Sequence, residues 1–366
     1  MIIYLIISIL LYTSLVLACT FAIKFRKTAE IVSPACTQGI SVLMAMRNEL
    51  DNLPFQKNQL LDILTDENIE VVIIDDHSDD GSSEWLKNNI MHPRFRFFHL
   101  PDGLQGKKNA LRYGLDKTIH SLVILTDADC IVQPGWALHM AGVMEKEQAS
   151  MLIGPVMLKK GNTCFENMQM IEFTGIQALT AGTALLGLPV SCNGANLAYN
   201  TDSLAVLKKG LTSPTPSGDD IFVLHALKKN KKKISCTLSP KALVITNAEK
   251  KIADFLNQRS RWAKKTIHFR YLPSVIVLLI ISNLYLSFLL SVFLTLAHFQ
   301  FLIACLGIFA VKTLADTLLI TTYALKTGFR LPLRYILPAG LFSVTYPPIL
   351  FFYTIFTTIQ WKGRKI

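Results

Sequence analysis

The sequence predicts an α/β domain with a mostly parallel central sheet, flanked by transmembrane helices. Two observations support this prediction. In the middle of the chain, short apolar segments that suit strands alternate with helical patterns, which indicates a parallel sheet. At both ends the chain is apolar over stretches of twenty or more residues, which is long enough to cross a bilayer.

The first segment, residues 1–23, is almost wholly apolar and is followed by Lys24, Arg26 and Lys27. We expect a transmembrane helix at 1–23 and a linker at 24–37. No positive charge precedes the apolar segment, which argues against a secretory signal. A secreted lipoprotein cut at Cys19 is the competing interpretation. The basic residues after the span predict a protein of the cell (inner) membrane whose following domain is cytoplasmic.

The central segment, residues 38–265, is expected to form the α/β domain. Predicted strands are Ile40–Met46, Glu70–Ile74 and Leu122–Thr126, and predicted helices include Leu53–Leu64 and Lys107–Leu115. Ligands of such sheets bind beyond the carboxyl ends of the strands. Acidic residues directly follow the second and third predicted strands, so we expect a site there.

The last segment, residues 266–366, is expected to form a membrane domain with two to three transmembrane or re-entrant segments. Candidate spans lie at about 273–297, 300–325 and 335–358, and prolines within the last one suggest that it is broken or re-entrant. Lys312 and Asp316 stand four residues apart in an apolar span. A structural ion pair is the expected role, with a part in an acceptor channel as the alternative.

The net charge of +11 also favours a membrane partner over nucleic acid, because the basic clusters adjoin apolar spans and no nucleic-acid recognition motif is present. The seven cysteines form no CxxC pair, so we expect neither a zinc site nor a disulfide framework, and each cysteine is interpreted as buried apolar filler. His77, His139 and His225 lack metal-ligand spacing.

Three features of the predicted sheet edge point to a nucleotide and a cation. Asp75 and Asp76 suit hydrogen bonds to a uracil or ribose, although a plain polar turn has the same composition. Lys107, at a helix start, suits a phosphate, although it is equally typical of an exposed lysine. Asp127 and Asp129 follow a strand and suit Mg²⁺ or Mn²⁺, since such cations bind carboxylate and phosphate oxygens. The alternative is a polar strand terminus.

Two further segments have both a catalytic and a structural interpretation. Asp219 and Asp220 begin a predicted helix, where an aspartate is either a helix cap or a general base that takes a hydroxyl proton. Asn196 lies in the small, polar segment 191–199, which suits either an acceptor pocket or an ordinary turn.

A basic and aromatic group precedes the last apolar region. Arg261 is able to hold phosphate oxygens with two donors, and Trp262 is able to pack on a sugar or acceptor face. A tryptophan-anchored membrane interface explains the lysines that follow, but it does not require Gln258.

Taken together, seven segments resemble, in order, the motif series of membrane-embedded family 2 glycosyltransferases. That family includes the cellulose, hyaluronan and poly-N-acetylglucosamine synthases and the ceramide glucosyltransferases. The segments are Ser41–Glu49, Asp75–Ser82, Gly106–Leu111, Thr126–Asp129, Gly194–Tyr199, Asp219–Asp220 and Gln258–Trp262.

The resemblance implies a GT-A nucleotide-diphospho-sugar transferase fold and an inverting mechanism without a covalent intermediate. It implies a metal at Asp127 and Asp129 and a base at Asp220; Asp219 stays open as the base because the family's usual Glu-Asp pair is Asp-Asp here. The residues implied to bind the nucleotide sugar are Arg47, Asn48, Glu49, Asp75, Asp76, Lys107 and Asp127. Those implied to bind acceptor and diphosphate are Asn196, Gln258, Arg261 and Trp262.

The short apolar tail favours transfer of one sugar, with a UDP-sugar as the favoured donor, to a lipid-linked or glycan hydroxyl. A processive polysaccharide synthase is the first alternative, and a non-catalytic membrane sensor of sugar nucleotides or translocation partner is the second. Residues Trp361–Arg364 resemble the basic ending of the ceramide-type enzymes, which implies a cytoplasmic C-terminus.

Overall fold

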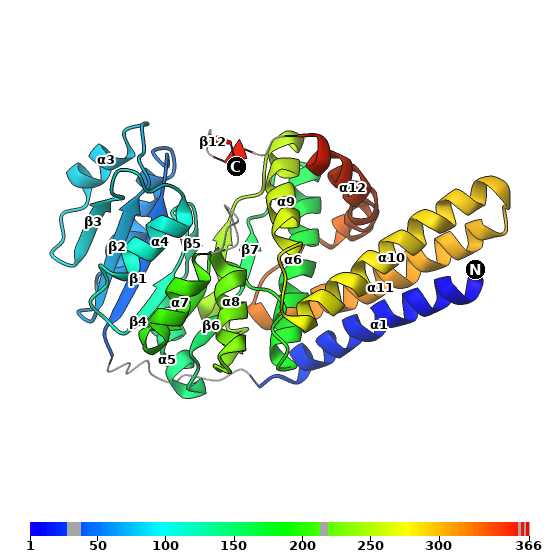
Figure 1. The fold of residues 1–366 in the computed structure, drawn as a ribbon, viewed down its shortest axis with the longest axis horizontal. Coiled ribbons are helices and arrows are strands. Elements are labelled where there is room, and N and C mark those ends of the chain that lie inside the picture. Colours follow the sequence, from blue (N-terminus) through cyan, green and yellow to red (C-terminus); the bar gives the residue numbers. More distant parts are fainter. Residues whose placement is uncertain (28–37, 213–218, 358–359, 362–363, 366) are drawn as a thin grey trace. The chain divides into compact units, whose positions relative to one another are not determined.

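The computed structural model describes the 366-residue chain except residues 28–37, 213–218, 358–359, 362–363 and 366 (Figure 1). The chain divides into two compact units, each assembled from separate stretches. The helical unit comprises residues 1–27, 158–190 and 248–357, and the sheet unit comprises residues 28–157, 191–247 and 358–366.

The sheet unit alternates strands with short helices. Its helices are α2 (Leu53–Ile63), α3 (Ser82–Asn89), α4 (Lys107–Leu115), α5 (Trp136–Glu147), α7 (Leu204–Gly210) and α8 (Asp219–Lys229), with 3₁₀ turns η1 (Thr201–Ser203) and η2 (Pro240–Ala242). Its strands are β1 (Ile40–Met46), β2 (Ile69–Asp75), β3 (Phe95–His99), β4 (Leu122–Leu125), β5 (Ile131–Val132), β6 (Met151–Ile153), β7 (Val156–Leu158), β8 (Leu197–Asn200), β9 (Ile234–Cys236), β10 (Val244–Thr246), β11 (Gln360–Trp361) and β12 (Arg364–Lys365).

In the described part of the chain, seven strands form the main sheet in the order β3-β2-β1-β4-β8-β6-β9. The first four run parallel to one another, β8 is antiparallel to β4 and β6, and β9 is parallel to β6. Smaller sheets pair β5-β10-β7 and β11-β12. This confirms the predicted α/β class with a mostly parallel sheet.

The predicted strands and helices of this unit agree closely with the structure. Strand β1 and helix α4 have the predicted bounds, while β2 begins one residue earlier and ends one residue later. Every residue of β2 and β4 is buried. Strands covered on both faces are near-continuous runs of Val, Ile and Leu, which is why the sequence pattern identified them.

The end of β2 opposite to Asp75 contains a buried charge that the sequence analysis did not single out. Glu70 is 1% exposed. Its carboxylate accepts hydrogen bonds from Ser41 Oγ at 2.5 Å, from the Ile119 amide at 2.8 Å and from Arg96 Nη1 at 2.9 Å. The ion pair and the hydrogen bonds offset the free-energy cost of burying this charge. They also connect β2 to β1, to β3 and to the loop between α4 and β4.

The helical unit consists of five long helices and one shorter helix, α9, among the described residues. Its helices are α1 (Ile2–Phe25), α6 (Cys164–Leu185), α9 (Ile252–Thr266), α10 (Leu272–Ala297), α11 (Phe301–Thr327) and α12 (Ile336–Phe356), with a 3₁₀ turn η3 (Leu333–Tyr335). Among the described residues, four helical segments are long and apolar enough to cross a membrane: Ile2–Phe25, Leu272–Ala297, Phe301–Thr327 and Leu333–Phe356. Their bounds match the predicted spans within two residues.

Helix α12 is continuous across Pro347 and Pro348, which lie inside it. The structure therefore shows an unbroken helix where a broken segment was one of the predicted alternatives. Prolines are tolerated in apolar helices where neighbouring groups satisfy the freed carbonyls.

Helix α6, although it lies between strands of the sheet unit along the chain, packs with α1, α11 and α12 in the helical unit (Figure 1). Its contact with α1 is very close. A Cβ atom added to Gly182 would meet the Cys19 Cβ at 2.4 Å. A glycine is therefore what lets these two helix backbones approach.

Polar side chains connect the apolar helices. Lys312 Nζ donates to Asp316 Oδ2 at 2.7 Å and to Ser343 Oγ at 2.9 Å, and the Tyr12 hydroxyl donates to Asp316 Oδ1 at 2.6 Å. The predicted structural ion pair is thus present, and it joins α1, α11 and α12.

The cysteines only partly match their predicted role as buried filler. Cys19, Cys130, Cys192 and Cys236 are buried, Cys305 is half-buried and Cys36 lies outside the described residues. Cys164 is exposed, so the prediction is wrong for this residue: it is the first residue of α6, where its side chain stands outside the packed face.

Candidate active site

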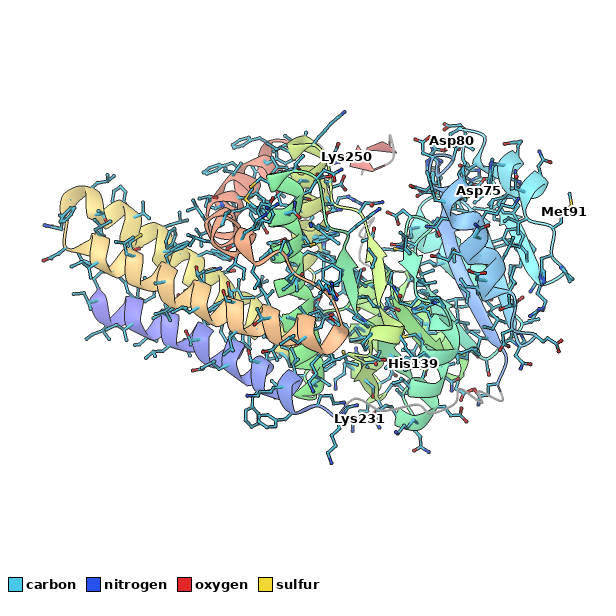
Figure 2. All side chains as sticks on the ribbon, turned by 180° about the vertical axis from the view of Figure 1, so that it is seen from behind. Asp75, Asp80, Met91, His139, Lys231 and Lys250 are labelled. Atoms are coloured by element: carbon cyan, nitrogen blue, oxygen red, sulfur yellow. The ribbon has the colours of Figure 1, made fainter. Side chains whose placement is uncertain are left out.

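The carboxyl end of β2 places Asp75 inside the sheet unit, with Asp80 in the loop beyond it (Figure 2). Asp75 is 1% exposed. It accepts hydrogen bonds from Ser78 Oγ at 2.5 Å and from Ser83 Oγ at 2.7 Å, and it lies 3.2 Å from His99 Nδ1. These bonds shape the turn after β2, so a direct contact of Asp75 with a nucleotide would require them to rearrange.

The loop after β1 packs against this turn. Arg47 Nη1 donates to the carbonyls of Asp76 and His77 at 2.6 and 2.7 Å. Asn48 has a positive φ of 51° and exchanges hydrogen bonds with Asp79 through its side chain. The Glu49 amide donates to a serine hydroxyl at the start of α3. The three predicted donor-binding residues, all in the loop after β1, therefore brace the turn after β2.

A chain of contacts leads from this loop pair to the acidic motif after β4. The Gly106 amide donates to Asp76 Oδ2 at 3.0 Å, and the next residue, Lys107, places its Nζ 2.5 Å from Asp127 Oδ1. Gly106 has a φ of 91°, a conformation in which a side chain would be strained. The structure therefore brings together Asp76, Lys107 and Asp127, three residues far apart in sequence.

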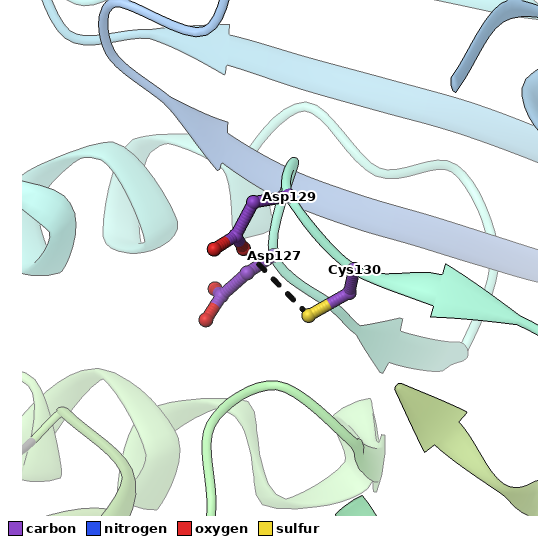
Figure 3. Close-up of side chains that lie close together, drawn as sticks. All are labelled: Asp127, Asp129 and Cys130. Atoms are coloured by element: carbon purple, nitrogen blue, oxygen red, sulfur yellow. Dashed lines mark hydrogen bonds between the residues drawn. The ribbon is translucent and has the colours of Figure 1, made fainter. Parts of the chain in front are cut away.

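The side chains of Asp127 and Asp129 lie side by side, next to Cys130 (Figure 3). One ligand atom from each residue lies within 4.8 Å of the other two. Both carboxylates are half-buried, and the Cys130 thiol, 3.7 Å from Asp129 Oδ1, is buried. Burial, with the nearby negative charges of Asp129 and then Asp127, holds the pKa of the Cys130 thiol well above its usual value. A neutral thiol leaves the two carboxylates as the donors, which is a set that suits a divalent cation such as Mg²⁺ or Mn²⁺.

Asp220 lies in the first turn of α8 and is half-buried. It lines a small cavity whose other walls are apolar or aromatic, including Leu111 of α4, Leu125 of β4 and Tyr199 of β8. The cavity thus adjoins the elements that carry Lys107 and Asp127. Asp219 begins the same helix.

Asn196 has a position that differs from its predicted acceptor contact. Its side chain is fully buried. The amide nitrogen donates to the carbonyls of Pro155 and Ala242, each at 2.8 Å, and the amide oxygen accepts from Trp136 Nε1 at 3.0 Å. A side chain so engaged holds the segment before β8 in place and offers nothing to a ligand.

The remaining predicted residues, Gln258, Arg261 and Trp262, lie on α9 in the helical unit. Gln258 Nε2 donates to Glu249 Oε1 at 2.9 Å. Burial lowers the pKa of Arg261, an effect that the negative charge of Glu249 opposes. The Trp262 ring lies 6.1 Å from that of Phe173 on α6.

Comparison with known proteins identifies the family. The model of "Glycosyl transferase family group 2" matches residues 122–355, which is well over half of the chain. The chain belongs to this family. The model of "Glycosyl transferase family 2" also matches, over residues 41–200, and a search of curated proteins found no match.

The fold of this glycosyltransferase resembles that of solved transferases. A mannosyltransferase from Pyrobaculum calidifontis, PcManGT, in complex with GDP-Man and Mn²⁺, matches with a TM-score of 0.52 and 15% identity, over 94% of this chain and 99% of its own. A glucosyl-3-phosphoglycerate synthase from Mycobacterium tuberculosis matches with a TM-score of 0.44 and 14% identity, over 66% of this chain and 84% of its own. The first of these supports the predicted GT-A fold.

Three residues near the predicted site residues were not singled out by the sequence analysis. Cys130 stands next to the acidic motif, and only its burial beside both carboxylates distinguishes it. Arg259 and Glu172 form an ion pair 2.5 Å long in the helical unit. Arg259 stands inside the recognised Gln258–Trp262 motif, so its place there was a usable signal, whereas nothing local marked Glu172.

Proposed function

We propose that the protein is a membrane-bound inverting glycosyltransferase. It moves one sugar from a nucleotide-diphosphate sugar, with a UDP-sugar as the favoured donor, to a hydroxyl of a lipid-linked or glycan acceptor. The observation that carries the proposal is the contact chain from Asp76 through Gly106 and Lys107 to Asp127, with Asp129 beside it. It supplies nucleotide, phosphate and cation ligands at one edge of a parallel sheet, where such sheets bind ligands.

The donor is assigned to this edge. Asp76 and the loops braced by Arg47, Asn48 and Glu49 form the nucleotide side of the site, and Asp75 shapes the turn beneath it. Lys107 neutralises Asp127 in this structure, and the same ammonium is suited to a diphosphate when a cation takes over Asp127.

The cation is assigned to Asp127 and Asp129. A bound Mg²⁺ or Mn²⁺ would neutralise charge on the departing diphosphate. The structural relative from Pyrobaculum calidifontis was solved with GDP-Man and Mn²⁺, which supports this assignment.

Asp220 is assigned as the base, with Asp219 as the alternative. The acceptor O–H proton passes to the carboxylate while the acceptor oxygen bonds to the anomeric carbon. The bond from that carbon to the diphosphate oxygen breaks, and the nucleoside diphosphate leaves with the electron pair. Asp220 lies at the wall of a cavity whose other lining residues are apolar or aromatic, and a carboxylate is able to take a hydroxyl proton.

The acceptor is assigned to Gln258, Arg261 and Trp262 on α9, in the unit that holds the four candidate spans. A group that recognises a sugar or a diphosphate, carried by a helix packed on apolar spans, suits a lipid-linked acceptor. The membrane domain is compact, which favours one sugar per acceptor over the channel of a processive synthase.

We further propose that residues 38–265 face the cytoplasm, between the span at 1–23, with its linker at 24–37, and the membrane domain at 266–366 in the cell (inner) membrane. Basic residues support this orientation, since Lys24, Arg26 and Lys27 follow the first span and Lys264 and Lys265 precede the second. A test is protease treatment of intact spheroplasts: the central segment should be cut only after lysis, and cleavage before lysis would reverse the orientation.

The enzyme purified in detergent tests the transfer reaction. It would be incubated with a polar lipid extract and radiolabelled UDP-glucose, UDP-N-acetylglucosamine or GDP-mannose. We expect label to enter the lipid fraction as a single sugar, to be lost with EDTA and to return with Mn²⁺ or Mg²⁺. A labelled polymer would identify a processive synthase instead. No transfer from any nucleotide sugar by the folded enzyme would contradict the proposal.

A further inference from the structure

The segment Gln258–Trp262 on α9 contains two residues to which the family resemblance gives no role. Between Gln258 and Arg261 stand Arg259 and Ser260, which are 3% and 0% exposed. The Ser260 hydroxyl lies 2.8 Å from that of Thr354 on α12. These two inner positions therefore attach the helix to its neighbours in the helical unit.

The Arg259 guanidinium is held at several points. Its Nη2 lies 2.5 Å from Glu172 Oε2, and the other oxygen of Glu172 accepts from the Tyr346 hydroxyl at 2.8 Å. Glu172 stands on α6 and Tyr346 on α12. The carboxylate thus receives one cation and one phenol, which fixes the position of the guanidinium from two helices.

The same guanidinium covers the face of Trp262. Its central carbon lies 4.2 Å from the Trp262 ring centroid and 5.0 Å from that of Phe255. Within the described chain, the Nε and Nη1 atoms of Arg259 are buried and have no hydrogen-bond partner. Of the three guanidinium nitrogens, only Nη2 forms a hydrogen bond among the described residues, to Glu172. The orientation of the Arg259 guanidinium is therefore set chiefly by this carboxylate and by the two aromatic rings.

We propose that Arg259 is a positioning residue, which holds the Trp262 indole in the orientation that receives the acceptor. Glu172 and Tyr346 act one step further away, because they fix the guanidinium. This inference rests on the proposed function, since it gives Trp262 an acceptor to receive. Arg259 itself touches no reacting atom and acts through the ring.

A purely structural role for Arg259 is the competing explanation, and Arg259→Lys separates the two. Lysine keeps the charge that pairs with Glu172 but lacks the flat guanidinium that lies on the ring. A matched control is Arg334→Lys, because Arg334 also lies on a ring, that of Tyr335 at 4.8 Å, but in an exposed position of the same unit.

Two measurements carry the test. The first is acrylamide quenching of Trp262 fluorescence, obtained as the difference between each protein and its Trp262→Phe counterpart. The second is the split of kcat and apparent KM, with a polar lipid extract in mixed micelles as the acceptor. For Arg259→Lys we expect quenching to rise about twofold and KM to rise about 5- to 10-fold with kcat within about twofold. Arg334→Lys should change neither.

A double-mutant cycle adds a readout that a structural role would not give. If Arg259 acts through the ring, Arg259→Lys should have little further effect on KM in a Trp262→Phe background. Native quenching and native KM in a folded Arg259→Lys enzyme, or fully additive effects in the cycle, would overturn the proposal. Should that variant not fold, Tyr346→Phe removes one bond to Glu172 and is expected to raise quenching in the same direction; unchanged quenching there would likewise overturn it.

The failure of this inference is distinguishable from failure of the proposed function. An enzyme that transfers no sugar contradicts the proposed function, while the quenching experiment still reports on the Arg259–Trp262 contact. An active enzyme in which neither Trp262 quenching nor the acceptor KM changes on Arg259→Lys contradicts only the inference.

Discussion

Two carboxylates of the helical unit and the Asp127–Asp129 pair of the sheet unit have different surroundings. In the helical unit, Glu172 and Asp316 each receive one cation and one tyrosine hydroxyl: Arg259 and Tyr346 for the first, Lys312 and Tyr12 for the second. In the sheet unit, Asp127 is 31% exposed and lies within ligand-sharing distance of Asp129.

The difference has a physical cause. A carboxylate packed among apolar helices has little access to water, so protein groups must supply most of its hydrogen bonds. At the edge of a sheet, two negative charges remain close only where water, a cation or a ligand offsets their repulsion. Saturated carboxylates therefore fasten helices together, while the close pair in the sheet unit is suited to binding.

Asp220→Asn tests the catalytic side of this comparison and should have the largest effect. The amide cannot take the acceptor proton, so we expect turnover to fall by about 10²- to 10⁴-fold. Binding of UDP in the presence of Mn²⁺ should persist, as measured by calorimetry. Full turnover by the folded variant would refute the role of Asp220.

Two companion variants sharpen that result. Asp219→Asn decides which of the neighbouring carboxylates is the base, since only one of the pair should cause the large loss. Asp102→Asn serves as the control, because Asp102 is an exposed aspartate of the same unit, and its turnover should stay close to that of the unmodified enzyme.

Lys312→Met tests whether the fully hydrogen-bonded carboxylate of Asp316 stabilises the helical unit. It leaves Asp316 between apolar helices with only the Tyr12 hydroxyl, so we expect a loss of about 3 kcal/mol in the free energy of unfolding. Thermal unfolding in detergent would measure it. Lys312→Met combined with Asp316→Asn removes both charges and should recover most of the loss. If the single variant is as stable as the parent, the pair is not what fastens these helices.

Lys107→Met tests whether the acidic pair is available to a cation. Lys107 Nζ lies 2.5 Å from Asp127, so a cation must displace the ammonium in the absence of nucleotide. Removing it should raise the affinity for Mn²⁺ alone about fivefold, while weakening nucleotide-sugar binding. Electron paramagnetic resonance of free Mn²⁺ gives the affinity. A weaker Mn²⁺ affinity would show that Lys107 does not compete for this site.

Local pattern was sufficient to predict three strands of the seven-stranded sheet, β1, β2 and β4, but not the other four. Strand β1 and helix α4 have their predicted bounds, because continuous apolar runs and a 3.6-residue period specify them within a few residues. The acidic motifs after β2 and β4 were found for the same reason: parallel strands deliver their carboxyl ends to one edge.

The packing of residues that are far apart along the chain was not predicted from the sequence. Helix α6 lies between two strands along the chain, and only its contacts with α1, α11 and α12 place Glu172 in the helical unit. Asn196 looked like a pocket residue because it is polar, but three partners distant in sequence bury it. Such partners leave no trace in the periodicity of a short segment.

His225 provides the smallest test, since it is a titratable group of the sheet unit near Asp220. Burial lowers its pKa to about 4, although the negative charge of Asp220 opposes the shift. The unfolded chain takes up a proton below about pH 6.5, whereas the folded protein does so only near pH 4, so stability must fall as the pH drops between those values. Because His225 keeps part of its surface in water, we expect about 1 kcal/mol. Unfolding at pH 7 and pH 5 should show this loss, and His225→Gln should reduce it; an equal loss in both proteins would assign it to other groups.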